Sequence, residues 1–517
     1  MDIEACVDES LAPQPTPSPD EPKREAVPVR RFISDTIIFG FVSVFDRAIG
    51  FILLPLTTWL MSPSEYGVLT LFQTTTELLQ YLIALGVYSA FFRFYLEVKD
   101  GDARNKIVNA AFWQVSVVTL IATLIFLPFV GAWNQWLFES RGIIFPLMII
   151  PTTYLAVLIS LGDCRLQADG KALSFLGVNM VHTVTMRGLS LALLFVGWGA
   201  SGWIVGLVVG QCITTTVFMF IAFGGLSWKL DFAAAKKLFW FGLPLVPLAV
   251  SHWAMQGSGK YVMNAMLENP LEQNGLYGVG ERISQIMAMM NLAFALGWRK
   301  FAFSNIHHED GPRLLGLGAT IFFAIAGFGA LGLISLGDDL TRWMIGQEYW
   351  AGVVVIPYLT LASFCWGMTE VLAISLYKSD KPQILSGCYM TAAVLCIALN
   401  LILVPRFGIV GAAQSWMIAE MFKTAVVWGA GQHFFPINIQ YGRCAVALAV
   451  YVPLLVICMV FFPTTTVATS VIQFLLVMSA PVILYFIGFI RPNEKQMAFE
   501  EVKKLIAKVR RKPAPSA

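Results

Sequence analysis

The sequence predicts an all-α membrane protein with about fourteen transmembrane helices. Of its 517 residues, 57% are hydrophobic and only 13% are charged, whereas an ordinary soluble domain has about 25% charged residues. The charges are clustered between apolar runs of roughly 20 residues, the length that one transmembrane helix needs. A transmembrane barrel would show short alternating segments instead. The composition therefore excludes a soluble multidomain enzyme.

The apolar runs and their polar breaks predict the spans in order along the chain. They lie near residues 32–60, 66–95, 107–129, 143–164, 173–196, 201–224, 241–266, 275–299, 314–336, 351–376, 384–404, 409–433, 442–462 and 467–490. This even number places both termini on the same side of the membrane.

The basic residues test this arrangement. Of 35 Lys and Arg residues, five fall well inside predicted spans and three lie in loops on one face, namely Arg141, Arg342 and Arg406. The other 27 lie in the tails, in the loops of the opposite face or, for Arg93, Arg299 and Arg443, at the span ends next to those loops. By the positive-inside rule that opposite face is cytoplasmic, and with it both termini.

An internal repeat divides the chain into two halves. Matching residues recur at offsets of about 210 residues: Tyr66-Gly67-Val68 with Tyr277-Gly278-Val279, Lys171 and Gly177 with Lys381 and Gly387, and Gly199 and Gly202 with Gly408 and Gly411. Each copy holds six spans, so both enter the membrane in the same direction. Parallel repeats of this kind build transporters with a central site between their halves.

Six segments follow from the repeat and from composition. We predict a disordered Pro-rich cytoplasmic tail at 1–31, an N-terminal six-helix lobe at 32–224, a cytoplasmic linker at 225–240, a C-terminal six-helix lobe at 241–433, two additional transmembrane helices at 442–490, and a basic amphipathic cytoplasmic tail at 491–517.

Four basic residues inside the spans are candidates for a substrate site. Arg47 and Lys260 lie midway along the first helix of each half, and with Arg282 they could form a positive site on the repeat axis. Arg187, in the fifth span, is a further candidate. Arginine suits phosphate because its planar fork donates two parallel hydrogen bonds, while lysine acts as a point charge.

The alternative for these charges is local neutralisation along one helix. Residues that are adjacent on a helix point about 100° apart, so Asp46 cannot neutralise Arg47 well, nor Glu281 its neighbour Arg282. Glu420 and Lys423 are three residues apart and can form an ion pair. The carboxylates Asp46, Glu77, Glu281 and Glu370 are candidates for coupling a proton or a sodium ion to transport.

The sequence contains few motifs typical of catalysis, metal binding or cofactor binding. The stretch His307-His308-Glu309-Asp310 has the composition of metal ligands but no HExxH spacing. There is no P-loop, no GxSxG elbow and no Rossmann fingerprint. We therefore expect no catalytic residue, no metal and no cofactor, and transport driven by an ion gradient, the membrane potential or the substrate gradient.

Several motifs resemble a known family, the Wzx-type polysaccharide biosynthesis flippases of the multidrug/oligosaccharidyl-lipid/polysaccharide exporter superfamily. The resemblance covers residues 35–490 and is carried by Phe45-Asp46-Arg47 with Leu54-Pro55-Leu56, Ser64-Glu65-Tyr66-Gly67, Leu85-Gly86 with Phe92-Arg93, and Asn400-Leu401-Ile402-Leu403-Val404-Pro405 with Gly408-Ile409-Val410-Gly411-Ala412-Ala413.

The resemblance implies two six-helix lobes in a V around a cationic cavity. It implies a multi-pass protein of the bacterial inner membrane that moves an undecaprenyl-diphosphate-linked oligosaccharide across the bilayer for O-antigen, capsule or exopolysaccharide synthesis. Arg47, Lys260 and Arg282 would correspond to the family's cavity residues. Membrane lipids, a polysaccharide polymerase and other assembly proteins are the implied partners, and no nucleic acid.

Three other functions remain open. A drug or cation antiporter of the same superfamily would need a negative cavity, against which the basic residues argue. A polysaccharide polymerase or ligase would need a large extramembrane domain, whereas the longest outer loop is short (337–350). The third alternative is a structural partner of the biosynthetic complex without transport of its own.

Overall fold

The computed structural model describes residues 29–224, 226–227, 231–379, 381–462 and 466–489. Every regular element in these ranges is a helix, as the sequence predicts. Residues 1–28 of the predicted N-terminal tail and all of the predicted C-terminal tail at 491–517 lie outside the described residues. Residues 29–31, assigned to the tail, begin the first helix.

The first half of the chain forms the helices α1 to α9. They are α1 (Val29–Ile52), α2 (Leu54–Leu60), α3 (Pro63–Ala84), α4 (Val87–Glu97), α5 (Gly101–Phe126), the short 3₁₀ helix η1 (Leu127–Phe129), α6 (Val130–Phe138), α7 (Ile144–Ala168), α8 (Ala172–Phe195) and α9 (Gly199–Ile221). The start of α3 is set by sequence: Ser62 and Glu65 form a reciprocal capping box, with Pro63 as the first helical residue.

The second half begins with a helix inside the predicted linker. It comprises α10 (Phe232–Gly242), η2 (Leu243–Leu245), α11 (Val246–Met266), α12 (Pro270–Asn305), α13 (Gly311–Met344), η3 (Gln347–Val355), α14 (Ile356–Leu372), α15 (Ile374–Lys378), α16 (Pro382–Phe434), α17 (Tyr441–Phe461) and α18 (Val467–Phe486). α10 packs against α4 and α5 of the first half. The predicted lobe and linker boundaries stay predictions.

Eleven helices in the described part of the chain are long and apolar enough to cross a membrane, or twelve if the bent pair α3–α4 is one span. The protein is thus a multi-pass membrane protein, but the count of fourteen is not confirmed. Two helices account for the difference. α16 has 53 residues but consists of two helices that meet at a break at Gly408, and at 1.5 Å per residue each of the two is long enough to cross the apolar part of a bilayer. α12, with 36 residues, is long enough to span but is less apolar than the other long helices.

The backbone at two glycines agrees with the internal repeat. Gly408 interrupts α16 with φ 58° and ψ −133°, and its counterpart Gly199 begins α9 with φ 54°. Only glycine adopts such positive φ values without steric cost. Both glycines therefore make the same kind of break, between the fifth and sixth predicted spans of each half.

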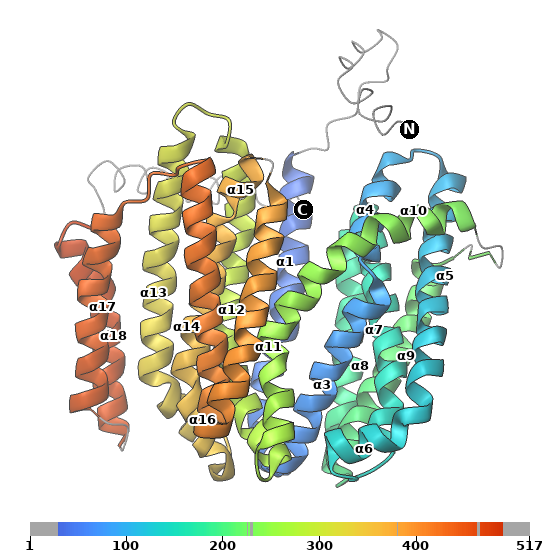
Figure 1. The fold of residues 1–517 in the computed structure, drawn as a ribbon, viewed down its shortest axis with the longest axis horizontal. Helices are drawn as coiled ribbons and strands as arrows, with labels where there is room; N and C mark the ends of the chain where they lie inside the picture. The colour runs from blue at the N-terminus through green and yellow to red at the C-terminus, as the bar shows by residue number, and fades with distance from the viewer. Residues whose placement is uncertain (1–28, 225, 228–230, 380, 463–465, 490–517) are drawn as a thin grey trace, which may run out of the picture.

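The helices form two groups that meet at one end. Figure 1 shows α3–α10 on the right and α11–α16 on the left, with α1 between them and α17 and α18 at the far edge beside α13. The groups approach each other at the lower end and diverge towards the upper end. α3 and α12 pack along each other and join the two groups.

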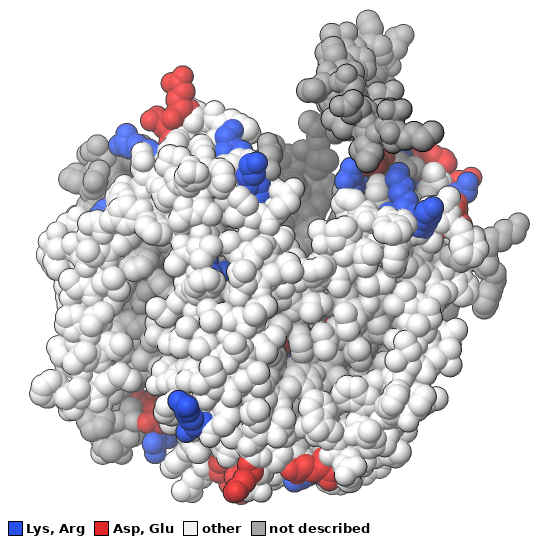
Figure 2. All heavy atoms as spheres, viewed as in Figure 1, with Lys and Arg blue, Asp and Glu red and all other residues white. Residues whose placement is uncertain are grey.

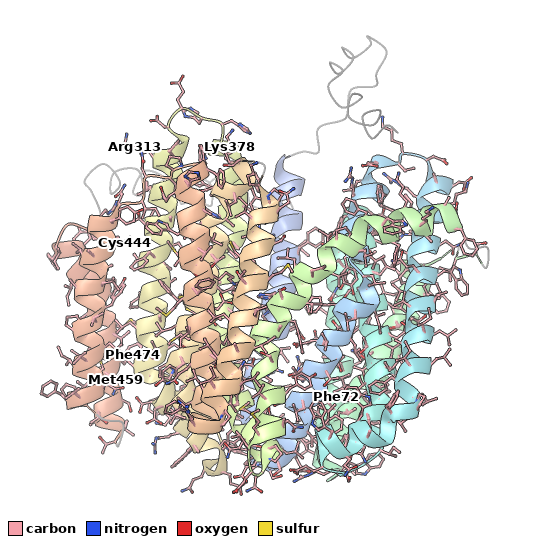
Figure 3. All side chains as sticks on the ribbon, in the orientation of Figure 1. Phe72, Arg313, Lys378, Cys444, Met459 and Phe474 are labelled. Atoms are coloured by element: carbon pink, nitrogen blue, oxygen red, sulfur yellow. The ribbon has the colours of Figure 1, made fainter. Side chains whose placement is uncertain are left out.

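The two ends of the bundle differ in charge. Lys and Arg gather at the upper end, few lie at the lower end, and a wide uncharged band separates them (Figure 2). Arg313 and Lys378 mark this upper end, which we call the basic face, while Met459 and Phe474 lie on the lower part of α17 and α18 (Figure 3). The uncharged band has the surface that lipid chains require.

The end opposite the basic face is closed by direct backbone contact between α3 and α12. A Cβ atom on Gly67 would lie 1.7 Å from the Leu271 carbonyl oxygen, and a Cβ on Gly275 1.9 Å from that of Pro63. The Tyr349 hydroxyl donates a hydrogen bond to the Met61 carbonyl oxygen at 2.9 Å. We call this contact region, with Gly67 and Gly275 at its centre, the closed end.

Replacing a glycine of the closed end tests this close approach. Gly275→Ala should lower the stability of the protein by about 1–3 kcal/mol, the usual cost of overpacking, measured as a lower thermal unfolding temperature in detergent. Gly188→Ala is the matched control, because no atom lies within 4 Å of the added Cβ. Alanine there should be neutral or stabilising. Equal unfolding temperatures for G275A and the parent protein would contradict the contact.

Candidate functional site: a polar cavity between the two helix groups

A polar cavity lies between the two helix groups, on the basic-face side of the closed end. It is lined from α1, α2, α3, α8, α9, α11 and α12, and has a volume of about 100 Å³. Its charged lining residues are Glu77, Arg187, Lys260, Glu281 and Arg282. Predicted site residues from four helices, α3, α8, α11 and α12, therefore line one cavity, although most of these helices are far apart in sequence.

The first ion pair of the site joins α1 and α8. Arg187 Nη2 lies 3.6 Å from Asp46 Oδ1, and the Thr183 hydroxyl donates to the same carboxylate at 3.4 Å. Gly50, one turn after Asp46, lies against the guanidinium, since a Cβ there would be in ordinary van der Waals contact, 3.5 Å from Arg187 Nη2. Asp46 itself does not line the cavity but neutralises a residue that does.

The second ion pair joins α11 and α12. Lys260 Nζ lies 2.8 Å from Glu281 Oε2 and 3.0 Å from Oε1. The two side chains are only 7% and 16% exposed. A charge held this far from water needs a partner, because its desolvation costs several kcal/mol. Lys260 and Glu281 provide that partner for each other.

Arg282 is held by neutral amides. Its Nη2 donates to Gln73 Oε1 on α3 at 2.5 Å, and its Nη1 donates to Gln285 Oε1 at 3.2 Å. Among the described residues no carboxylate oxygen lies within 4 Å of this guanidinium. Arg282 is therefore the cavity cation whose charge is not cancelled by a direct ion pair.

The neighbouring charges pair as helical geometry predicts. Glu281 bonds to Lys260 and not to adjacent Arg282, and Asp46 bonds to Arg187. Arg47, next to Asp46, is exposed and does not line the cavity. The predicted positive site thus consists of Arg187, Lys260 and Arg282, and two of these three are already neutralised.

The two remaining candidates for ion coupling, Glu77 and Glu370, lie in different parts of the protein. Glu77 is exposed to the cavity and interacts electrostatically with Lys260, Glu281 and Arg282. Glu370 lies elsewhere, in the C-terminal half, where its Oε2 is 3.8 Å from Arg299 Nη2. The roles of the predicted site residues stay predictions.

The site also contains uncharged polar residues that were not predicted as ligands, chiefly Gln285, Gln256 and Tyr66. The position of the two glutamines could have been predicted from their spacing in the sequence. Gln285 follows Arg282 by three positions and Gln256 precedes Lys260 by four, spacings that place two side chains on one helix face. Tyr66 offers no such signal, because its place depends on how α3 packs against α12. Within the described residues no group of three or more His, Cys, Asp or Glu side chains could hold a metal ion.

Comparisons with known proteins agree with the resemblance. Residues 57–296 match the profile of a family described as Polysaccharide biosynthesis protein. Lsg locus putative protein 1 of Haemophilus influenzae is 21% identical over 74% of this chain and 95% of its own. A probable low-salt glycan biosynthesis flippase, Agl15 of Haloferax volcanii, is 20% identical over 78% of this chain and 85% of its own.

Solved structures show the same fold. The lipid II flippase MurJ in an inward closed conformation superposes with a TM-score of 0.74 at 13% identity, covering 88% of this chain and 99% of that one. A multidrug resistance MATE family transporter of the MOP superfamily, in an inward-facing conformation, gives 0.60 at 12% identity over 82% and 99% of the two chains.

Removing one or both members of the Lys260–Glu281 pair tests the electrostatics of the site. Lys260→Met and Glu281→Gln should each destabilise the protein, by less than the roughly 3–5 kcal/mol lost when a dry pair is broken, because Glu281 faces the cavity. The double variant K260M/E281Q should recover most of this loss. Thermal unfolding of all four proteins measures the coupling, and a double variant as unstable as the sum of the singles would contradict the pairing.

Proposed function

We propose that the chain is a polysaccharide biosynthesis flippase of the MOP superfamily and that it moves an undecaprenyl-diphosphate-linked oligosaccharide across the bacterial inner membrane. It would do so by alternating access, for O-antigen, capsule or exopolysaccharide synthesis, and not as an enzyme. The single observation that carries this proposal is Arg282, a cation without a direct carboxylate partner, in a polar cavity between the two helix groups.

The chemistry of a diphosphate suits this cavity. Diphosphate and sugar are costly to desolvate in hydrocarbon, so they need a polar path, while a prenyl chain can remain in lipid. Gln73 and Gln285 hold the Arg282 guanidinium without cancelling its charge. Arginine then offers two parallel, charge-assisted hydrogen bonds to a phosphate.

The size of the cavity supports movement of the helix groups. About 100 Å³ holds several water molecules but is well below the roughly 300–1,000 Å³ of typical ligand pockets. The groups diverge towards the basic face, which we take as cytoplasmic together with both termini, and they meet at the opposite end. Substrate would enter from the basic face, and release on the other side would require the closed end to separate.

The relatives support the same substrate class. One is named as a probable glycan biosynthesis flippase, and the protein with the same fold at a TM-score of 0.74 is a lipid II flippase. A polysaccharide polymerase and other assembly proteins would be the partners that consume the translocated product.

Substitution of Arg282 tests the proposal in the native host. In cells that lack the chromosomal gene, Arg282→Ala should reduce surface polysaccharide at least tenfold and accumulate the lipid-linked oligosaccharide, quantified by mass spectrometry of lipid extracts. Arg282→Lys should keep partial export, since it keeps the charge but not the planar fork.

Arg313→Ala is the control, because Arg313 is an exposed residue of the basic face outside the cavity. It should export normally. Normal export by R282A at normal protein abundance would overturn the role of Arg282 in binding the diphosphate.

A drug or cation antiporter is the second candidate, favoured by one observation: Glu77 is exposed to the cavity. A cation carrier would depend on this carboxylate and tolerate loss of Arg282. If Glu77→Gln abolished resistance to cationic drugs while R282A left polysaccharide unchanged, the antiporter would replace the flippase.

A further inference from the structure

A second group of ionisable residues lies inside the C-terminal half, apart from the central cavity. Glu420 and Lys423 on α16 are both 0% exposed, and Lys423 Nζ lies 2.7 Å from Glu420 Oε2. Neither residue lines the central cavity. The predicted i,i+3 ion pair is therefore formed, and both of its members are fully buried.

The pair has few other polar contacts. Trp416 Nε1 donates to Glu420 Oε1 at 3.3 Å, and the Lys423 ammonium lies 4.1 Å from the centre of the Tyr389 ring. An ammonium has three N–H donors, and apart from the ion pair Lys423 Nζ has no hydrogen-bond partner among the described residues. A pair with so little additional hydrogen bonding is poorly compensated for its desolvation.

Titratable groups that interact with the pair come from α11, α14 and the first part of α16. They are His252 from α11, Cys365 and Glu370 from α14, and Cys388, Tyr389 and Cys396 from the first part of α16. No second cation lies among them that would hold Glu420 ionised if Lys423 were lost. The charge state of the cluster therefore depends mainly on these two residues.

Tyr389 contacts both the pair and Glu370, since its ring lies against the Lys423 ammonium. The Tyr389 hydroxyl donates to Glu370 Oε1 at 3.3 Å. Glu370 Oε2 in turn lies 3.8 Å from Arg299 Nη2, and these side chains are 39% and 73% exposed. Lys423 is eleven residues before the end of α16 at Phe434, a depth of about 16 Å at 1.5 Å per residue. Glu370 thus stands between water and the buried pair.

Purely structural reasons do not account for such a pair. Replacing a buried ion pair by apolar residues of similar volume is often neutral or stabilising. A buried carboxylate beside a cation, reached through a second carboxylate at the surface, instead has the arrangement of a site that gains and loses a proton.

We propose that the Glu420–Lys423 pair is the proton-binding site that drives movement of the two helix groups. The proton forms an O–H bond with the Glu420 carboxylate, the ion pair is lost, and Lys423 stays an ammonium, so the cluster gains one positive charge. On release this O–H bond breaks and the proton leaves to water on the side of Glu370. The paired state in the structure is then the state after release towards the basic face.

Protonation would act on the packing around the pair. An ammonium left unpaired at 0% exposure costs several kcal/mol, so the helices around it must separate enough to admit water or a new partner. α11 packs against α16, with Asn400 Nδ2 donating to Ser258 Oγ at 3.0 Å. Two residues further along α11, Lys260 lines the central cavity. α11 therefore links the pair to the substrate site.

The experiment measures the shape of the full chain at different pH values, without substrate. Fluorescent labels are attached to genetically encoded unnatural residues at Asp102 and Gln383, exposed positions at the basic-face ends of α5 and α16, and energy transfer between them is recorded in nanodiscs from pH 5.5 to 8. Acid pH should shorten the distance as the basic face closes. For one coupled proton the ratio of the two states changes by up to about tenfold per pH unit.

The decisive variant is Glu420→Gln with Lys423→Met, which removes both charges and nearly keeps the volume. It should fold and lose the pH response. The control D338N/R342M removes the partly exposed pair of α13, whose Nε–Oδ1 distance is 2.8 Å, and should keep the response. A pH response in E420Q/K423M equal to that of the parent protein, or none in the parent protein, would overturn the proposal.

A further variant decides the matter if the double variant fails to fold. Glu420→Asp keeps both ionisable groups but lengthens the gap between them, so it should move the midpoint of the response; an unchanged midpoint would overturn the proposal. The inference rests on the proposed function only in that transport needs a driving force. No glycan is present in this assay, so its failure and that of the R282A experiment are distinguishable.

Discussion

The arrangement of this protein depends on the cost of holding an ionised side chain away from water. An uncompensated charge in a membrane interior costs several kcal/mol, and three basic side chains inside the helices here are paired with carboxylates. Lys260 is held by Glu281, Arg187 by Asp46 and Lys423 by Glu420. The first two pairs join different helices, so each pair also fixes how those helices lie. At these two pairs, the need to neutralise a buried charge also determines how the two helices pack against each other.

The contact between α3 and α12 both closes one end of the protein and positions Arg282 in the cavity. Gly67 and Gly275 let the two backbones touch at the closed end, and farther along the same two helices the Arg282–Gln73 hydrogen bond crosses between the helix groups. Separating the helices at the closed end would therefore strain or break the bond that holds Arg282. A ligand that takes over the hydrogen bonds of Arg282 would remove one of the interactions that keep α3 and α12 together. Binding in the cavity and movement of the groups are linked through this residue.

Two polar sites of different character share helix α11. The central cavity contains amides and partly exposed charges, which suits a large polar ligand that brings its own hydration. The Glu420–Lys423 pair is dry and small, which suits a proton. Placing Ser258 against α16 and Lys260 in the cavity makes α11 the element that both sites contact. The apolar helices α17 and α18 pack on α13, away from both sites.

The membrane environment, the helical class and the two-fold internal repeat could be predicted from the sequence, because apolar runs, clustered charges and recurring glycines are local properties of the chain. The sequence also predicted that Asp46 would not neutralise Arg47 well and that Glu420 could pair with Lys423, since both follow from 100° per residue on one helix. Only the tertiary structure decided which distant charges meet. Arg47 lies outside the cavity and Asp46 turns to Arg187, because the rotation of α1 against α8 is set by packing. Arg282 finds Gln73, 209 positions away, because α3 and α12 approach at glycines whose partners cannot be read from local periodicity.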